Sequence, residues 1–91
     1  MSLPILIIED EAAIADSIAY ALRTEGFEPH HVSLGEAGLA ALQDEHAPDF
    51  QLIVLDIGLP DVNGFEVCRR LRRFSDVPVI FLTARSDEID R

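Results

Sequence analysis

Basic residues are scarce in this sequence, and lysine is absent from it. The 91 residues contain 7 basic side chains, all of them arginine, against 17 aspartates and glutamates, so the formal charge is −10 at pH 7. A chain with this charge is repelled by nucleic-acid backbones and anionic membranes, because both present negative phosphates. The composition therefore argues against direct nucleic-acid binding and favours cations, or partners with a basic surface.

Cysteine and long apolar runs are also scarce. Cys68 is the only cysteine, so no internal disulfide can form, as is usual in a reducing cytosol. No segment approaches the ~20 apolar residues of a membrane span. The apolar stretch at 3–8 lacks the basic leader of a signal peptide. We therefore expect a soluble, cytoplasmic protein without membrane contact, and a single small domain over residues 1–91.

Three short segments, 5–8, 52–55 and 77–82, are almost continuously apolar and predict buried strands. Apolar residues at successive positions indicate burial on both faces, as in a parallel sheet that is covered by helices. A weaker strand is expected at 28–32. It should lie at an edge of the sheet, because Pro29 has no N–H to donate to a neighbouring strand.

Helical patterns fill the segments between these strands. One helix is expected over 12–25, where apolar residues recur every four positions before the helix-stopping Gly26. A second is expected over 33–45, because Ser33 and Glu36 have the spacing of a capping box. Strands and helices therefore alternate along the chain.

A third helix is expected after Asn63, which repeats the capping-box spacing with Glu66. Phe65, at its start, is expected to pack beneath the loop that follows Asp56. A fourth helix is expected to begin near Ser86. The buried face of the third helix should consist of Val67, Cys68, Leu71 and Phe74.

This alternation predicts an α/β fold with a doubly wound parallel sheet, because crossover connections between parallel strands are right-handed. The expected strand order is 2-1-3-4, which is the flavodoxin-like (CheY-like) arrangement. In such sheets a ligand lies beside the carboxyl ends of strands 1 and 3.

Carboxylates follow the two strands that this order makes neighbours. Glu9 and Asp10 come directly after the first strand, and Asp56 directly after the third. Like charges about 4 Å apart repel by about 4 kcal/mol at an effective dielectric near 20, and Mg²⁺ relieves that repulsion with its preference for oxygen ligands. We expect Asp10 and Asp56 to bind Mg²⁺ directly, Glu9 to bind through a water, and the Gly58 carbonyl to add a ligand.

Asp56 is also a candidate nucleophile. A carboxylate beside Mg²⁺ can attack a phosphoryl donor and form an acyl phosphate. Thr83 follows the fourth predicted strand and should lie next to Asp56, with Ala84 leaving room for a phosphoryl group. A hydroxyl that is drawn towards a new phosphoryl group can carry its loop with it, which makes Thr83 a candidate switch residue.

Together these motifs resemble the receiver domain of bacterial two-component response regulators. The matching segments are Ile-Ile-Glu9-Asp10-Glu11, Ile-Val-Leu-Asp56-Ile-Gly-Leu-Pro60-Asp61-Val-Asn-Gly64 and Phe-Leu-Thr83-Ala84-Arg85. They follow the family's order and spacing, and the resemblance covers the whole chain. It implies that Asp56 accepts phosphate from a sensor histidine kinase, that Glu9 and Asp10 hold Mg²⁺, and that Thr83 is the switch.

The segment 85–91 resembles the fourth helix of OmpR/PhoB-like regulators, which carry a winged-helix DNA-binding domain. This resemblance implies a homodimer formed through that helix, and a DNA-binding output domain in the full-length protein. The family pattern also has a fifth strand, a fifth helix and a lysine at the end of the fifth strand, all of which this sequence lacks. We therefore expect residues 1–91 to be a partial receiver domain of a longer regulator.

Other functions fit the sequence less well. A Mg²⁺-dependent phosphatase with an aspartate nucleophile normally places it after the first strand, with a second aspartate two residues later, where this chain has Gly58. A nucleotide-binding module would need glycines in the turn after strand one, which is acidic here. A receiver-like scaffold that takes no phosphate is the main alternative, because the family's lysine is missing. The three histidines lack metal-ligand spacing, and the arginines at 69–73 are expected on a solvated helix face.

Overall fold

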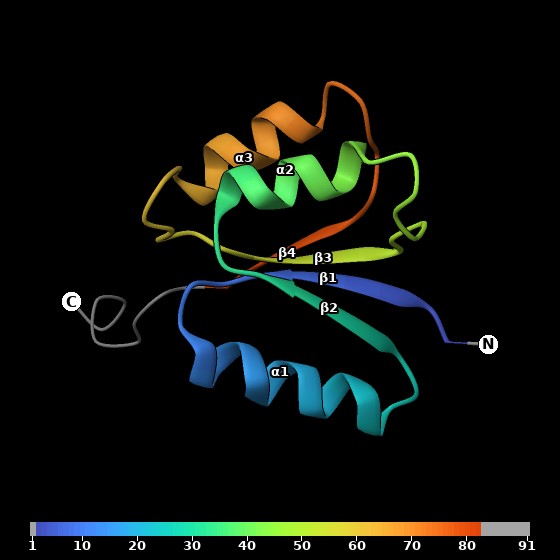
Figure 1. The fold of residues 1–91 in the computed structure, drawn as a ribbon. Coiled ribbons are helices and arrows are strands. Elements are labelled where there is room, and N and C mark those ends of the chain that lie inside the picture. Colours follow the sequence, from blue (N-terminus) through green and yellow to red (C-terminus); the bar gives the residue numbers. More distant parts are fainter. Residues whose placement is uncertain (1, 83–91) are drawn as a thin grey trace.

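The computed structural model describes residues 2–82, which form a four-stranded parallel sheet with helices on both faces (Figure 1). The strands are β1 (Pro4–Ile8), β2 (Glu28–Val32), β3 (Leu52–Asp56) and β4 (Val79–Leu82), and the helices are α1 (Ala12–Thr24), α2 (Gly35–Gln43) and α3 (Gly64–Leu71). The strand order is β2-β1-β3-β4 and every neighbouring pair is parallel. The predicted doubly wound, flavodoxin-like sheet is therefore confirmed.

The helices divide the core into two layers. Helix α1 covers one face of the sheet, and α2 and α3 lie together on the other (Figure 1). In β1, Leu6 and Ile8 face the α2–α3 side, whereas Ile5 and Ile7 face α1. All four are at most 2 % exposed, which explains the unbroken apolar pattern of this strand. In the described part of the chain, no helix is long and apolar enough to cross a membrane.

Strands β2 and β4 lie at the two edges of the sheet that residues 2–82 form. Within residues 2–82, strand β2 pairs with β1 alone and so lies at an edge, as Pro29 predicted. Strand β4 begins at Val79 rather than at residue 77 as expected, because Pro78 has no N–H for the ladder. Pro78 still accepts a hydrogen bond from the Ile53 N–H at 2.9 Å. Ile80 of β4 is 53 % exposed.

The predicted capping box at the start of α2 is wrong. The helix begins at Gly35, and its N-cap residue, Leu34, makes no side-chain cap hydrogen bond. The first N–H groups of the helix instead donate to the Asp61 carboxylate, which reaches them from the loop before α3. The helix ends at Gln43, two residues before the expected end. A spacing rule that considers one helical turn cannot detect a cap from so far along the chain.

The cap of α3 is confirmed, in contrast. Asn63 Oδ1 accepts a hydrogen bond from the Phe65 N–H at 2.7 Å. Glu66 does not complete the capping box, because its carboxylate binds the side chain of Arg69 one turn later at 2.8 Å. Asn63 therefore provides the side-chain cap of this helix by itself.

The predicted buried face of α3 is only partly correct. Val67 and Leu71 are fully buried, and Cys68 packs at the edge of the same cluster. Phe74 is 41 % exposed, because the helix ends at Leu71 and its periodicity no longer sets the direction of later side chains.

The expected position of Phe65 is also wrong. Its side chain is 57 % exposed and does not pack beneath the loop after Asp56. Its ring instead contacts the ring of Phe81 on β4, with 5.0 Å between centroids. This contact between α3 and the edge strand depends on the tertiary arrangement.

The assignment of the α2 and α3 caps can be tested by comparing the stability of two variants, Asn63→Ala and Ser33→Ala. Asn63→Ala should lower the free energy of unfolding by about 1 kcal/mol, because an orphan N–H of α3 loses its acceptor. Ser33→Ala should change it by less than about 0.5 kcal/mol, as expected for a surface site. Chemical denaturation of both variants measures the difference. Equal losses would contradict the assignment of the α2 cap to Asp61.

Candidate functional site

The carboxyl ends of β1 and β3 bring three acidic side chains together. Residues Ile8 and Leu55 are paired in the sheet, so Glu9 and Asp10, which follow β1, come next to Asp56 at the end of β3. One carboxylate oxygen from each of the three residues lies within 4.8 Å of those from the other two. The convergence that the strand order predicted is present.

The three carboxylates differ in their environment. Glu9 and Asp56 are each 3 % exposed, whereas Asp10 is exposed. Glu9 Oε2 accepts a hydrogen bond from the Glu11 N–H at 2.9 Å, and Asp56 Oδ1 accepts one from the Gly58 N–H at 3.2 Å. The site is therefore a buried acidic pair with one solvent-facing carboxylate beside it.

Burial and mutual repulsion disfavour the charged forms of the buried pair. Burial raises the pKa of Glu9, the Glu11 N–H opposes this, and the charges of Asp56 and Asp10 raise it further. Burial likewise raises the pKa of Asp56, against the opposing Gly58 N–H and together with Asp10. Holding all three ionised at neutral pH costs free energy unless a cation shares the site.

A divalent cation fits this chemistry. The buried polar or charged side chains found within residues 2–82 are Glu9 and Asp56 themselves, and no ion pair of the described chain reaches either of them. Two buried carboxylates and an exposed one offer hard oxygen ligands while leaving one side open to solvent. Mg²⁺ prefers such a site, because it binds through one or two carboxylates and keeps several waters.

The remaining predicted residues are only partly placed. The Gly58 backbone lies at the site through its N–H on Asp56, and its carbonyl as a metal ligand stays a prediction. Thr83, Ala84 and the segment 85–91 lie outside the described residues. The preceding residue, Leu82, pairs with Asp56, and its carbonyl accepts from the Ile57 N–H at 3.3 Å.

Two residues that surround the site were not identified as important from the sequence. His31 Nε2 lies 2.7 Å from the Glu9 carbonyl oxygen, so the edge strand β2 contacts the residue after β1. Gly64 approaches the site from α3: a Cβ at this position would lie 2.3 Å from the Asp56 carbonyl oxygen. The signals for Gly64 were its place at the start of a capped helix and in the receiver motif that begins before Asp56, and His31 had none.

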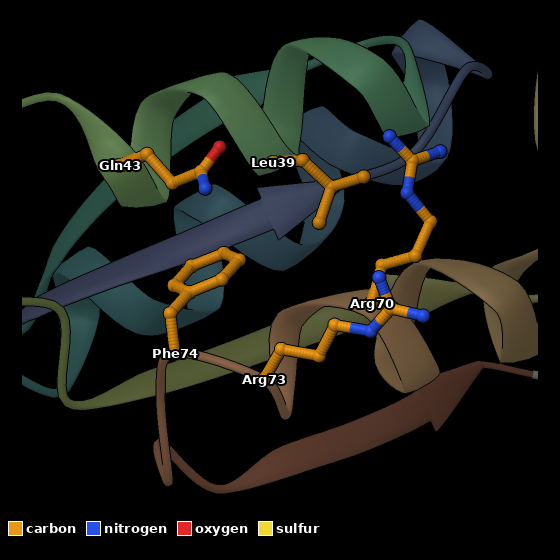
Figure 2. A pocket seen from close by; sticks show the side chains of 5 residues that line it. All are labelled: Leu39, Gln43, Arg70, Arg73 and Phe74. Carbon is orange, nitrogen blue, oxygen red and sulfur yellow. The ribbon is translucent and has the colours of Figure 1, made fainter.

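A separate concavity of about 230 Å³ lies between α2 and α3 (Figure 2). Leu39 and Gln43 of α2 face Phe74, Arg70 and Arg73 across it. The Arg70 guanidinium is bound by the Glu36 carboxylate at 2.8 and 3.0 Å. None of the candidate site residues within 2–82 lines this groove. The Arg70–Glu36 pair agrees with the expected solvated, acid-balanced helix face.

Residues 5–91 match the model of the response regulator receiver domain. The chain belongs to this family. The family predicted from the three motifs is therefore confirmed. The sheet order and the position of the acidic site at the ends of β1 and β3 are those expected from the order of strands and helices along the sequence.

Two curated relatives of this receiver-family chain are regulators of transcription or sensory transduction by name. It is 45 % identical over 86 residues to the transcriptional regulatory protein CreB of Escherichia coli, covering 93 % of this chain and 36 % of CreB. It is 46 % identical over 87 residues to the sensory transduction protein RegX3 of Mycobacterium tuberculosis, covering 96 % of this chain and 37 % of RegX3. The chain thus spans little more than a third of the length of these relatives.

A solved structure agrees with the fold. The BeF3-activated N-terminal receiver domain of Klebsiella pneumoniae RstA has a TM-score of 0.80 and 26 % identity, covering 96 % of this chain and 72 % of that one. The match extends over nearly all of this chain, so the whole sheet and its helices, rather than one motif, agree with a receiver domain.

Proposed function

We propose that this chain is a phosphorylation-controlled signalling switch that accepts a phosphoryl group on Asp56 from a sensor histidine kinase. The observation that carries the proposal is the cluster of Glu9, Asp10 and Asp56, whose carboxylate oxygens lie within 4.8 Å of one another. In a chain of the receiver family, such a cluster fits Mg²⁺ and presents Asp56 as the acceptor. Asp10 and Asp56 bind the ion directly, and Glu9 through a water.

The chemistry is a displacement at phosphorus. An oxygen of the Asp56 carboxylate forms a P–O bond while the P–N bond of a phosphohistidine breaks, and the imidazole leaves with that electron pair. Bound Mg²⁺ supplies charge neutralisation for the attacking and transferring oxygens. The Gly58 N–H keeps the Asp56 side chain oriented through its 3.2 Å hydrogen bond. Slow hydrolysis of the acyl phosphate resets the switch, so the protein is a substrate more than an enzyme.

The output proposed for the full-length protein is regulation of transcription. This follows from CreB, which is a transcriptional regulatory protein by name, and from the resemblance of 85–91 to the fourth helix of OmpR/PhoB-like regulators. We assign residues 1–91 to a receiver domain of a cytoplasmic protein. Phosphate on Asp56 draws the Thr83 hydroxyl inward, and this change favours a homodimer through the fourth helix. With a charge of −10, this domain does not contact DNA itself, and a separate output domain does so.

Phosphorylation of the full-length protein with a small phosphodonor and Mg²⁺ tests this function. Intact mass should increase by one phosphoryl group that hydroxylamine removes, as expected for an acyl phosphate. Asp56→Asn should abolish the increase, and Asp49→Asn, an exposed acid before β3, should not. A hydroxylamine-labile gain that survives Asp56→Asn would sink the assignment, whereas a wild type that takes no phosphate at all would favour the unphosphorylated scaffold.

A further inference from the structure

The N-terminus of α2 is capped from a loop that is distant in sequence. The Gly35 N–H donates to Asp61 Oδ1 and the Glu36 N–H to Asp61 Oδ2, both at 2.9 Å. These residues are 26 and 25 positions apart from Asp61. The first N–H groups of a helix have no partner within the helix, and a carboxylate is favoured there by the helix dipole.

The capping residue belongs to the loop that follows Asp56 and donates a hydrogen bond to its carboxylate. Asp61 is three residues beyond Gly58, whose N–H donates to Asp56 Oδ1. On its other side the loop closes where the Gly64 N–H donates to the Ile57 carbonyl at 2.9 Å. The loop is thus held at Asp56, at the start of α3 and, through Asp61, at α2.

Apolar contacts on both sides of Asp61 add to this attachment. Leu59 is 8 % exposed and belongs to the core cluster beneath α2 and α3. A Cβ on Gly35 would lie 3.1 Å from Val62 Cγ1 and 3.4 Å from Leu59 Cδ1. The loop therefore rests directly on the first turn of α2, and the Asp61 hydrogen bonds set its register there.

We propose that Asp61 is a positioning residue of the Asp56 site: by accepting both N–H groups of α2, it holds the loop so that Gly58 stays over Asp56. This inference rests on the proposed function, in which the Gly58 N–H orients the phosphate-accepting Asp56 and the Gly58 carbonyl binds Mg²⁺. The loop without this attachment should sample positions in which Gly58 no longer faces the carboxylates, and Mg²⁺ binding should weaken.

The same end of α2 provides a matched control. Glu36 is the second residue of the helix, and its carboxylate binds Arg70 of α3 with two hydrogen bonds. The Arg70 side chain points towards this end of α2 (Figure 2). Glu36→Gln removes one negative charge and one attachment of α2, as Asp61→Asn does, but leaves the loop attached.

The experiment measures Mg²⁺ affinity by isothermal titration calorimetry on the full-length protein, at a temperature where every variant is folded by circular dichroism. Asp61→Ala should weaken Mg²⁺ binding about tenfold, within the range seen when an outer-shell partner of a metal site is lost. Asp61→Asn keeps one acceptor oxygen and should lose less. The Mg²⁺ affinity of Glu36→Gln should stay within about twofold of that of the wild type. The exposed Glu36 carboxylate is not part of the acidic site, and salt largely screens its charge.

A second readout follows amide hydrogen exchange in the metal-free protein. Asp61→Ala should speed exchange of the Gly58 N–H, which Glu36→Gln should leave unchanged. Wild-type Mg²⁺ affinity in Asp61→Ala, or equal weakening in Asp61→Ala and Glu36→Gln, would overturn the positioning role alone. Failure of the wild type to bind Mg²⁺ would instead overturn the proposed function, and this inference with it.

Discussion

At pH 7, Mg²⁺ at one hundred times its dissociation constant should raise the free energy of unfolding by about 2.7 kcal/mol. Folding buries Glu9 and Asp56 and brings Asp10 within 4.8 Å of both, so the metal-free protein carries three repelling charges. A cation that binds only the folded state relieves this repulsion. Urea unfolding with and without MgCl2, at constant ionic strength, measures the gain.

The Asp56→Asn variant separates this effect from general salt stabilisation. It should lose most of the Mg²⁺ gain, and its metal-free form should be more stable than wild type by about 1 kcal/mol, because one of three converging charges is gone. Asp49→Asn removes an equal charge before β3, at the other end of the strand, and should respond to Mg²⁺ as wild type does. An undiminished Mg²⁺ gain in Asp56→Asn would place the ion elsewhere.

The same charges set the sign of the pH dependence. Burial raises the pKa of Glu9 and Asp56, so the folded state keeps these protons to higher pH than the unfolded state. Their contribution to stability is fully present below the unfolded values near about 4 and is lost as pH rises through the folded values. Thermal unfolding without Mg²⁺ should therefore show stability falling towards neutral pH, and Mg²⁺ should reduce that fall.

Asp61 and Glu36 make the stability of the protein depend on pH in the opposite direction. The N–H of Glu36, and then that of Gly35, hold the pKa of Asp61 below its usual value, and the Arg70 guanidinium does the same for Glu36. Their contribution is present above the unfolded values and lost as pH falls through the lower, folded ones. Stability should thus also decline below about pH 4, which leaves a maximum in mildly acid solution.

Gly64→Ala should destabilise the protein by about 3 kcal/mol, at the upper end of what overpacking usually costs. The new Cβ would lie 2.3 Å from the Asp56 carbonyl oxygen and 2.8 Å from Ile57 Cα. Alanine is a better helix former than glycine by about 1 kcal/mol, but the clash is with backbone and cannot be relieved by rotating a side chain. Denaturant unfolding measures the loss.

Gly38→Ala is the contrasting case. Its Cβ would lie 2.3 Å from Ile8 Cδ1, which is the end of a side chain that Ile8→Val removes. The free energy of unfolding of the double variant should therefore fall by about 1 kcal/mol less than the two single losses added together.

A Gly64→Ala protein as stable as wild type would contradict the close approach of α3 to Asp56.

Periodicity and chemistry along the chain were sufficient for most of the fold. The unbroken apolar runs predicted buried parallel strands, and Pro29 predicted an edge strand, because both patterns reflect the environment of each residue separately. The strand order was expected as the flavodoxin-like order of a doubly wound sheet, with the second strand at an edge. Glu9, Asp10 and Asp56 were predictable as a cluster for the same reason, since the ends of neighbouring parallel strands share one edge.

The failed predictions have two physical causes. The Ser33–Glu36 spacing predicted a local cap, but the α2 N–H groups bind Asp61, 26 and 25 residues away. Phe74 was expected on the buried face of a helix that ends before reaching it, at Leu71. Phe65 contacts Phe81 of β4, which no pattern within α3 could indicate. For the α2 cap and for Phe65, a contact between separate elements replaced the local preference.

The sequence by itself determined the alternation of strands and helices and the positions of Glu9, Asp10 and Asp56 directly after two strands, because these depend on hydrophobic periodicity and chain direction. Only the tertiary structure decided that Glu9 and Asp56 are buried while Asp10 faces solvent. It also decided that Asp61 holds the loop of the site on α2. Burial and hydrogen bonding across elements depend on how helices pack on the sheet, and that packing is set by the whole core rather than by any one segment.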